Sequence, residues 1–341
     1  MKQFKTLLPV TIIAIVMLAS CQKEMKPGAN TVTTNLTTGS QATVLSPALK
    51  AKLAIWRKSL PAGAEKRIQQ TSLLLQKVDP QYREMVQRMT NVTPAAACDA
   101  NTLLTQWLGQ QIADWDSDVI YFAVVTGMLD FPTYNALFFE NDPNNQYFGV
   151  TGNETKIITK TFKDLKRFWN IQTDGIIAAG MHGNMLLDPA KIIRVDMLLY
   201  GDSPSDAAYW AELIVSLVTE IPQYRRGDHP IFTFNSFAQP AFNFPPYGLI
   251  PSKIVMGDGI MAGMAGIGYD DVAPQAILAH EYGHQVQFQL NIFGDGTPEG
   301  TRRQELMADA FAAYYLPHAR GASMQWKRVR QFLQVFYNIG D

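Results

Sequence analysis

Two pairs of residues, each four positions apart, constrain the fold of this 341-residue chain more than any other feature. His280 and His284 lie in ILAHEYGHQVQ, whereas Glu305 and Asp309 lie in RRQELMADAFAAYY. Residues four apart on an α-helix project from nearly the same face, one turn apart. The sequence therefore predicts two helices that carry these pairs, joined by the short, turn-rich loop NIFGDGTPEG.

The chemistry of these side chains favours a single zinc site. Two neutral imidazoles one helical turn apart can bind one Zn²⁺, and a carboxylate from the second helix can supply the third protein ligand. Glu281 stands beside the first histidine and can take the proton of a water molecule that the metal activates, so H-E-x-x-H on a helix indicates hydrolysis. We predict that His280, His284 and Glu305 bind zinc and that Glu281 is the general base.

The sequence around the first pair argues against a chance match. Asp309 can accept the other ring N–H of a ligating histidine, which fixes the tautomer and orients the ring. Asp270 or Asp271 can cap the first helix, and Pro274 fits its first turn. The alternative is an ordinary helix whose buried histidines are satisfied by backbone carbonyls. Two matched pairs on consecutive helices make that alternative the weaker one.

HEYGH followed by ELMAD resembles the gluzincin superfamily of zinc peptidases. ILAHEYGHQVQ and ELMADAFA are similar to the neutral zinc metallopeptidases of bacteria, and NSFA followed by KIVMGDGIM resembles a strand pair of membrane-associated prenyl-protein endopeptidases. The likeness covers roughly residues 230–316. It implies a zincin-like domain in which both histidines and the downstream glutamate bind zinc, with peptide-bond hydrolysis as the activity.

The rest of the chain predicts an α+β fold dominated by helices, with a small mixed sheet. TLLTQWLGQQI, TKIITKTFKDLKRFW and DAAYWAELIVSLVTEI have helical periodicity, and a helix is expected to start at Ser46. GIIAAGM, PIFTFNSF and SKIVMGD favour strands. Gly257, Gly259 and Ala262 imitate a dinucleotide fingerprint, but no regular βαβ alternation surrounds them. We expect an edge strand and turn there, which could pair with an extended peptide.

The N-terminus has the layout of a bacterial lipoprotein signal peptide. A positively charged start and a short apolar stretch, too short to span a bilayer, precede the lipobox-like LASC, which predicts acylation of Cys21. The alternative is a signal peptide or weak anchor with an incidental cysteine. Cys98, the only other cysteine, then has no disulfide partner within the chain. The expected organisation is a signal peptide over 1–21, a flexible tether over 22–45, a helical segment over 46–95 and the catalytic domain over 96–341.

Charge and sorting signals bear on partners and location. A net charge of -1, without long charged runs, gives no electrostatic footprint for nucleic acid. We expect a protein or peptide substrate, membrane contact through the N-terminal lipid, and no nucleotide. Gln22 after the cysteine favours the outer membrane of the cell envelope, while Lys23 and Glu24 resemble export signals of surface lipoproteins.

Several other polar residues carry weaker signals. The acidic run DWDSD lacks the glycine and glutamate of a calcium loop, so a solvated turn or a helix cap is expected there. His182 and His229 have no partners at ligand spacing and are interpreted as structural or exposed. Tyr314, Tyr315 or His318 could donate to the oxyanion of a hydrolytic intermediate, or could simply fill the core.

The competing function is a non-catalytic zinc-fold lipoprotein that acts as a binding or scaffold module. Folding alone would not require Glu281, so its presence favours the enzyme.

Overall fold

The computed structural model describes residues 44–64, 102–294 and 297–339. The predicted signal peptide, Cys21, Cys98 and residues 65–95 of the predicted helical segment therefore lie outside the described residues, as does nearly all of the predicted tether. Within the described ranges, no helix combines the length and the apolar character that a bilayer crossing demands.

The helices predicted from periodicity are confirmed. They are α1 (Pro47–Ser59), α4 (Leu103–Gln111), α7 (Thr155–Phe168) and α9 (Pro204–Glu220). Ser46 and Thr102 cap the first two, because each side-chain oxygen accepts a backbone N–H from the first turn. Of the two alternatives for the acidic run DWDSD, the structure shows the helix cap, since Asp116 accepts the backbone N–H groups of Asp118 and Val119.

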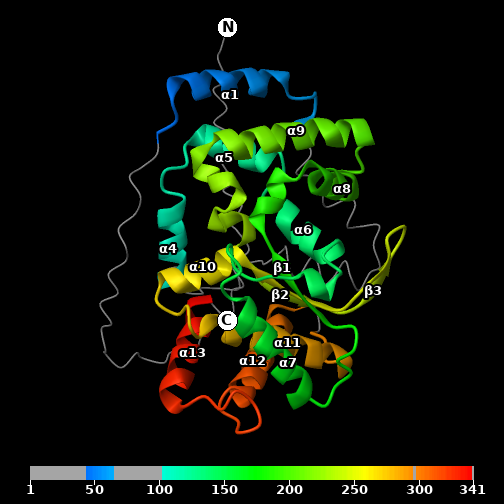
Figure 1. The fold of residues 1–341 in the computed structure, drawn as a ribbon, viewed down its shortest axis with the longest axis vertical. Helices are drawn as coiled ribbons and strands as arrows, with labels where there is room; N and C mark the ends of the chain where they lie inside the picture. Colours follow the sequence, from blue (N-terminus) through cyan, green and yellow to red (C-terminus); the bar gives the residue numbers. More distant parts are fainter. Residues whose placement is uncertain (1–43, 65–101, 295–296, 340–341) are drawn as a thin grey trace.

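The remaining helices complete two layers around a small sheet. They are α5 (Ser117–Val125), α6 (Phe131–Phe138), α8 (Pro189–Tyr200), α10 (Asp258–Gly266), α11 (Ala273–Gln289), α12 (Pro298–Tyr315) and α13 (Trp326–Ile339). Short 3₁₀ turns connect them at Pro143–Asn145, Gly183–Leu187, Pro222–Gly227 and Pro230–Thr233. In Figure 1, α6, α8 and α9 lie above the sheet, whereas α7, α11, α12 and α13 lie below it.

The main sheet is mixed and has three strands in the order β1-β5-β2. β1 (Ile177–Met181) runs parallel to β5 (Lys253–Gly257), and β2 (Ser236–Gln239) runs antiparallel to β5 on its other side. Every position of the three strands is buried, because helices cover both faces. A separate hairpin pairs β3 (Phe242–Phe244) with β4 (Gly248–Ile250). The helix-dominated α+β fold with a small mixed sheet is thus confirmed.

Two predictions about the strands are wrong. PIFTFNSF begins as a 3₁₀ turn, because His229 accepts the backbone N–H of Ile231, and only its last two residues belong to β2. The glycine-rich segment is not an edge, since β5 is the central strand and α10 starts directly after it. Gly259 is needed there: a Cβ at this position would lie 2.0 Å from the carbonyl oxygen of Pro230.

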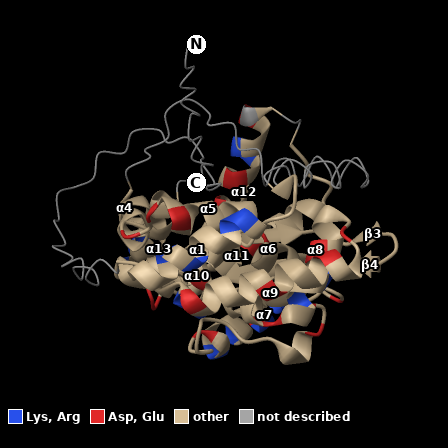
Figure 2. Ribbon diagram, turned by 90° about the horizontal axis from the view of Figure 1, so that it is seen from above, with Lys and Arg blue, Asp and Glu red and all other residues tan. Residues whose placement is uncertain are grey.

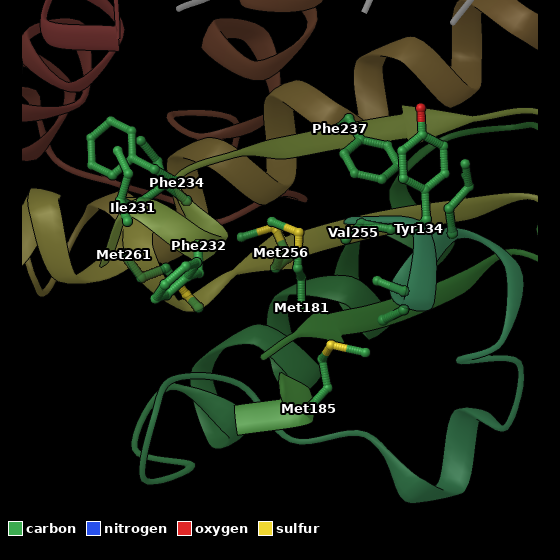
Figure 3. Packing of buried hydrophobic residues seen from close by; sticks show 14 of the residues in the cluster. Tyr134, Met181, Met185, Ile231, Phe232, Phe234, Phe237, Val255, Met256 and Met261 are labelled. Carbon is green, nitrogen blue, oxygen red and sulfur yellow. The ribbon is translucent and has the colours of Figure 1, made fainter. Parts of the chain in front are cut away.

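The core spans both faces of the sheet. Methionine and phenylalanine side chains from the strands and the adjoining turns fill the space around β5, including Met181, Met256, Phe232, Phe234 and Phe237 (Figure 3). A lysine also lies within this core. Lys253 is fully buried and donates to the carbonyl oxygens of Ala136 and Leu137, each at 2.8 Å. These two hydrogen bonds join the central strand to the C-terminal end of α6.

Candidate metal centre

The HEYGH motif lies in the middle of α11, a helix enclosed by β2, β5, α7, α12 and α13. Gly283 lets α12 approach closely, since a Cβ there would lie 3.0 Å from the Cα of Ala308 and 3.1 Å from its carbonyl oxygen. The predicted cap is wrong. Val272 precedes the helix without a side-chain cap, and Asp271 instead pairs with Arg328 of α13. Pro274 does occupy the first turn.

The structure brings the three predicted ligands together. The Nε2 atoms of His280 and His284 are 3.1 Å apart, and Oε2 of Glu305 lies 3.3 Å from each of them. Zinc bonded at about 2.0–2.1 Å to a tetrahedral set of ligands separates those ligand atoms by about 3.3 Å. The triangle of nitrogen and oxygen atoms is therefore the size that a tetrahedral zinc ion requires.

Hydrogen bonds on the far side of each ring determine which nitrogen faces the centre. Nδ1 of His280 donates to Oδ1 of Asp309 at 2.9 Å, as predicted for Asp309. Nδ1 of His284 lies 2.9 Å from Oε1 of Gln287, whose own amide nitrogen donates to the Gln304 carbonyl at 2.7 Å. The Gln287 oxygen must therefore be the acceptor. Neutral His280 and His284 then both turn Nε2 lone pairs towards the centre.

Three acceptors facing one another without a donor form an unfavourable arrangement unless a cation lies between them. Oε2 of Glu305 is buried and makes no hydrogen bond of ordinary geometry. His280, His284 and Glu305 also form the one group of potential metal ligands found in the part of the chain that the structure describes. Two imidazole nitrogens and a carboxylate oxygen are the donor set that Zn²⁺ accepts, so these residues fit a metal ion.

The electrostatics of the centre agree with this interpretation. Burial opposes ionisation of Glu305, but the imidazoles of His284 and His280 hold the pKa of this carboxyl well below its usual range. Burial likewise opposes protonation of His284, yet the Glu305 carboxylate raises the pKa of that ring. The Glu305 carboxylate thus stays ionised and favours positive charge, on a ring or on a metal ion, at the position where the three ligand atoms meet.

Glu281 is the predicted general base and does not belong to the ligand triangle. Its side chain is buried, and burial raises its pKa above the ordinary value, although His280, His284 and Ser236 act in the opposite direction. A carboxylate of raised pKa in a dry site is better able to take a proton than one in water.

Sequence reasoning missed the role of Gln287. This glutamine is fully buried, and its amide joins His284 on α11 to the backbone of α12 directly before Glu305. Gln285, two positions earlier, is buried to the same degree but turns towards the sheet, where it donates to the carbonyls of Gln239 and Lys253. The available signal was an amide three residues after the second histidine, because an amide can accept and donate at once.

The other candidate residues lie elsewhere. Tyr314, Tyr315 and His318 gather around the ring of Phe168, with centroid distances of 5.8, 5.1 and 5.2 Å, whereas the His280 ring contacts Phe336 of α13. The proposed part of any of these three in stabilising an oxyanion stays a prediction. His182 bonds to Asp258 at 2.8 Å, and His229 bonds to the Gln111 carbonyl at 2.9 Å, consistent with structural roles for both.

Comparison of the chain with protein-family models, with curated proteins and with solved structures finds no match. No relative therefore assigns roles to these residues.

Proposed function

We propose that this protein is a zinc-dependent endopeptidase with a zincin-like fold. His280, His284 and Glu305 would hold the metal, and Glu281 would act as the general base. The observation that carries the proposal is the triangle of three lone pairs at zinc-ligand separations, next to a buried carboxylate that is not one of the ligands.

The chemistry follows from the positions of these side chains. Zinc in such a site supplies a Lewis acid that polarises a carbonyl and lowers the pKa of water. Glu281 accepts a proton from the attacking water and returns it to the leaving amine, a task for which its raised pKa is suited. Asp309 and Gln287 keep the two imidazoles neutral and oriented, so that only Nε2 is available for binding.

We further propose that the protein is anchored by lipid in the bacterial cell envelope. The lipobox-like LASC supports acylation of Cys21, which would attach the protein to the bacterial cell envelope, at the outer membrane. A substrate of protein or peptide nature is consistent with that location and with the resemblance to gluzincins.

One feature favours the competing function, a zinc-fold lipoprotein without catalysis. His280 and Glu281 are each only 3% exposed, and the ring of Phe336 lies 5.5 Å from the ring of His280. Structural zinc sites are closed, whereas catalytic sites keep one position open. Deep burial of the ligands is therefore the expected property of a structural site.

Glu281→Gln separates the two functions. The purified full chain is analysed for zinc content and for turnover of an unbiased peptide library. The peptidase proposal requires that wild-type protein cleaves peptides and that Glu281→Gln keeps its zinc but loses nearly all turnover, because the amide cannot accept the proton. Zinc binding without turnover in either protein would favour the scaffold function, and turnover unchanged by Glu281→Gln would refute the assigned base.

A further inference from the structure

The segment 240–251, PAFNFPPYGLIP, contains no charged residue, and its only polar side chains are those of Asn243 and Tyr247. Lysines, arginines, aspartates and glutamates are interspersed over the rest of the ribbon, whereas the β3–β4 end carries none (Figure 2). We call this segment the apolar hairpin. A stretch of this composition ordinarily becomes part of a protein core.

The apolar hairpin instead projects from the body. β3 and β4 pair with each other and not with the main sheet, and in Figure 1 they extend beyond the helices at one side. Leu249 is 71% exposed and Tyr247 is 40% exposed, and Pro245 and Pro246 between the strands are exposed as well. Large apolar side chains are thus presented at the tip, where a protein that meets only water would place polar ones.

Aromatic contacts hold both the base of the hairpin and Tyr247 near its tip. The Phe138 ring, on α6, contacts Phe242 and Phe244 at centroid distances of 6.0 and 4.9 Å, and Phe139 contacts Tyr247 at 5.6 Å. Ile250, at the end of β4, is buried. The hairpin is therefore held outwards by packing, and the exposure of its tip is a property of the fold.

We propose that the tip of the apolar hairpin, formed by Pro245, Pro246, Tyr247 and Leu249, inserts into the interfacial region of a lipid bilayer. Tyrosine, with an apolar ring and a polar hydroxyl, is enriched at this depth of membranes. The absence of charge removes the main cost of entry, and the tip offers no ionic group for selective pairing with a protein partner. This proposal does not depend on the metal site.

The position of Cys21 supplies a second reason for a lipid partner. If Cys21 is acylated as the sequence predicts, the chain between it and Val44 spans at most roughly 80 Å when fully extended. The body is then confined near the bilayer at an effective concentration in the millimolar range, at which even a weakly binding tip is occupied. The lipid would attach the protein, and the hairpin would orient it.

Orientation matters because the hairpin continues directly from β2. Gln239, the last residue of β2, is bonded through its carbonyl to Gln285 of α11, the helix that carries HEYGH. A bilayer contact at the tip would therefore hold α11 at a defined height and tilt relative to the membrane surface.

The first test measures binding to vesicles of phosphatidylcholine by co-sedimentation. All proteins are full-length and carry Cys21→Ser, so that acylation does not contribute. Tyr247→Asp combined with Leu249→Asp should lower the partition coefficient at least about tenfold, whereas Ile55→Asp, at an exposed position on α1, should leave it unchanged. Partition should be equal in about 0.1 M and about 1 M salt, because the tip is uncharged.

A second measurement reports the position of the tip itself. Leu249→Cys or Ile55→Cys is introduced with Cys21→Ser and Cys98→Ser and is labelled with nitrobenzoxadiazole. Vesicles should shift the emission of the label at 249 to the blue and leave the label at 55 unchanged. Vesicle binding without a shift at 249, or binding lost in high salt, would overturn the proposal. Concentration-dependent dimerisation abolished by the hairpin substitutions, without vesicle binding, would assign the tip to a second copy instead.

Discussion

Gln287 and Gln285 provide a matched pair for testing how the metal centre is held. Both are buried on α11, and each makes two side-chain hydrogen bonds. Methionine has a similar shape and makes no such bonds. Each bond contributes about 0.5–1.5 kcal/mol, and each buried partner left unpaired costs about 1–3 kcal/mol. Two unpaired partners per variant lead us to expect that Gln287→Met and Gln285→Met lower the free energy of unfolding of the metal-free protein by similar amounts, about 2–6 kcal/mol.

Zinc affinity should distinguish them. Gln287 accepts from Nδ1 of His284 and holds the backbone next to Glu305, so its loss affects two of the three ligands. Removing a partner that orients a ligating histidine typically weakens metal binding about 10–100-fold, or about 1.4–2.7 kcal/mol. Gln285 contacts only the carbonyls of the sheet, and Gln285→Met should leave zinc affinity unchanged.

The assay is competition for zinc with a chelator of known affinity at fixed pH, combined with urea unfolding of the metal-free proteins. Gln287→Glu adds a third arm. Its carboxylate still accepts from His284 but places an oxygen against the Gln304 carbonyl, so stability should fall while most zinc affinity remains. Equal zinc affinities for Gln287→Met and Gln285→Met would refute the assigned role of Gln287.

Three further predictions concern the ligands, the helix contact and the buried lysine. Glu305→Ala should sharply reduce zinc stoichiometry in elemental analysis, whereas Asp309→Ala should only weaken affinity by about 10–100-fold; the opposite order would make Asp309 the ligand. Gly283→Ala forces a contact with the backbone of Ala308, which should lower the free energy of unfolding by about 1–3 kcal/mol. The higher helix propensity of alanine offsets about 1 kcal/mol of this loss. Adding Ala308→Gly should not restore stability, because the contact is with the backbone. Full rescue in thermal unfolding of the double variant would show that the clash is not with the backbone. Burial lowers the pKa of Lys253 to about 7 from an ordinary 10.5, so between these values the unfolded chain binds the additional proton and stability rises with pH. Lys253→Met should remove this rise in the free energy of unfolding, which amounts to at most about 1.4 kcal/mol per pH unit. Denaturation at several pH values measures the rise, and an equal rise in wild-type and Lys253→Met protein would contradict the prediction.

The ligand triangle could be predicted from the sequence because helical periodicity places each pair on one face and the ligand chemistry relates the two pairs. His280 with His284, and Glu305 with Asp309, share a face whenever their segments are helical, and a shared metal site requires the two faces to meet, as they do where α12 packs on α11. The bridge made by Gln287 could not be predicted in this way. It requires the Gln304 carbonyl to lie within reach, and that depends on how closely α12 crosses α11 at Gly283.

The errors have the same origin, in contacts between residues distant along the chain. Asp271 is a reasonable cap by local rules, but Arg328, which lies on α13, binds it instead. The residues after Pro230 have strand-like composition, yet His229 folds them into a turn. The central position of β5 could not be recognised from its own residues, because strand order depends on which partners arrive on either side.

The strand order also has a consequence for the synthesis of the chain on the ribosome. β5 is the last of the three main-sheet strands to be made, and it is the one that both others pair with. Until it emerges, β1 and β2 have no partner in the main sheet, and their buried side chains remain exposed to solvent. Pairing over such sequence separations is slow, and unpaired strands are prone to aggregate. We therefore expect nascent chains that end before Lys253 to depend on chaperones, and chains that extend through Tyr315 to gain protease resistance abruptly.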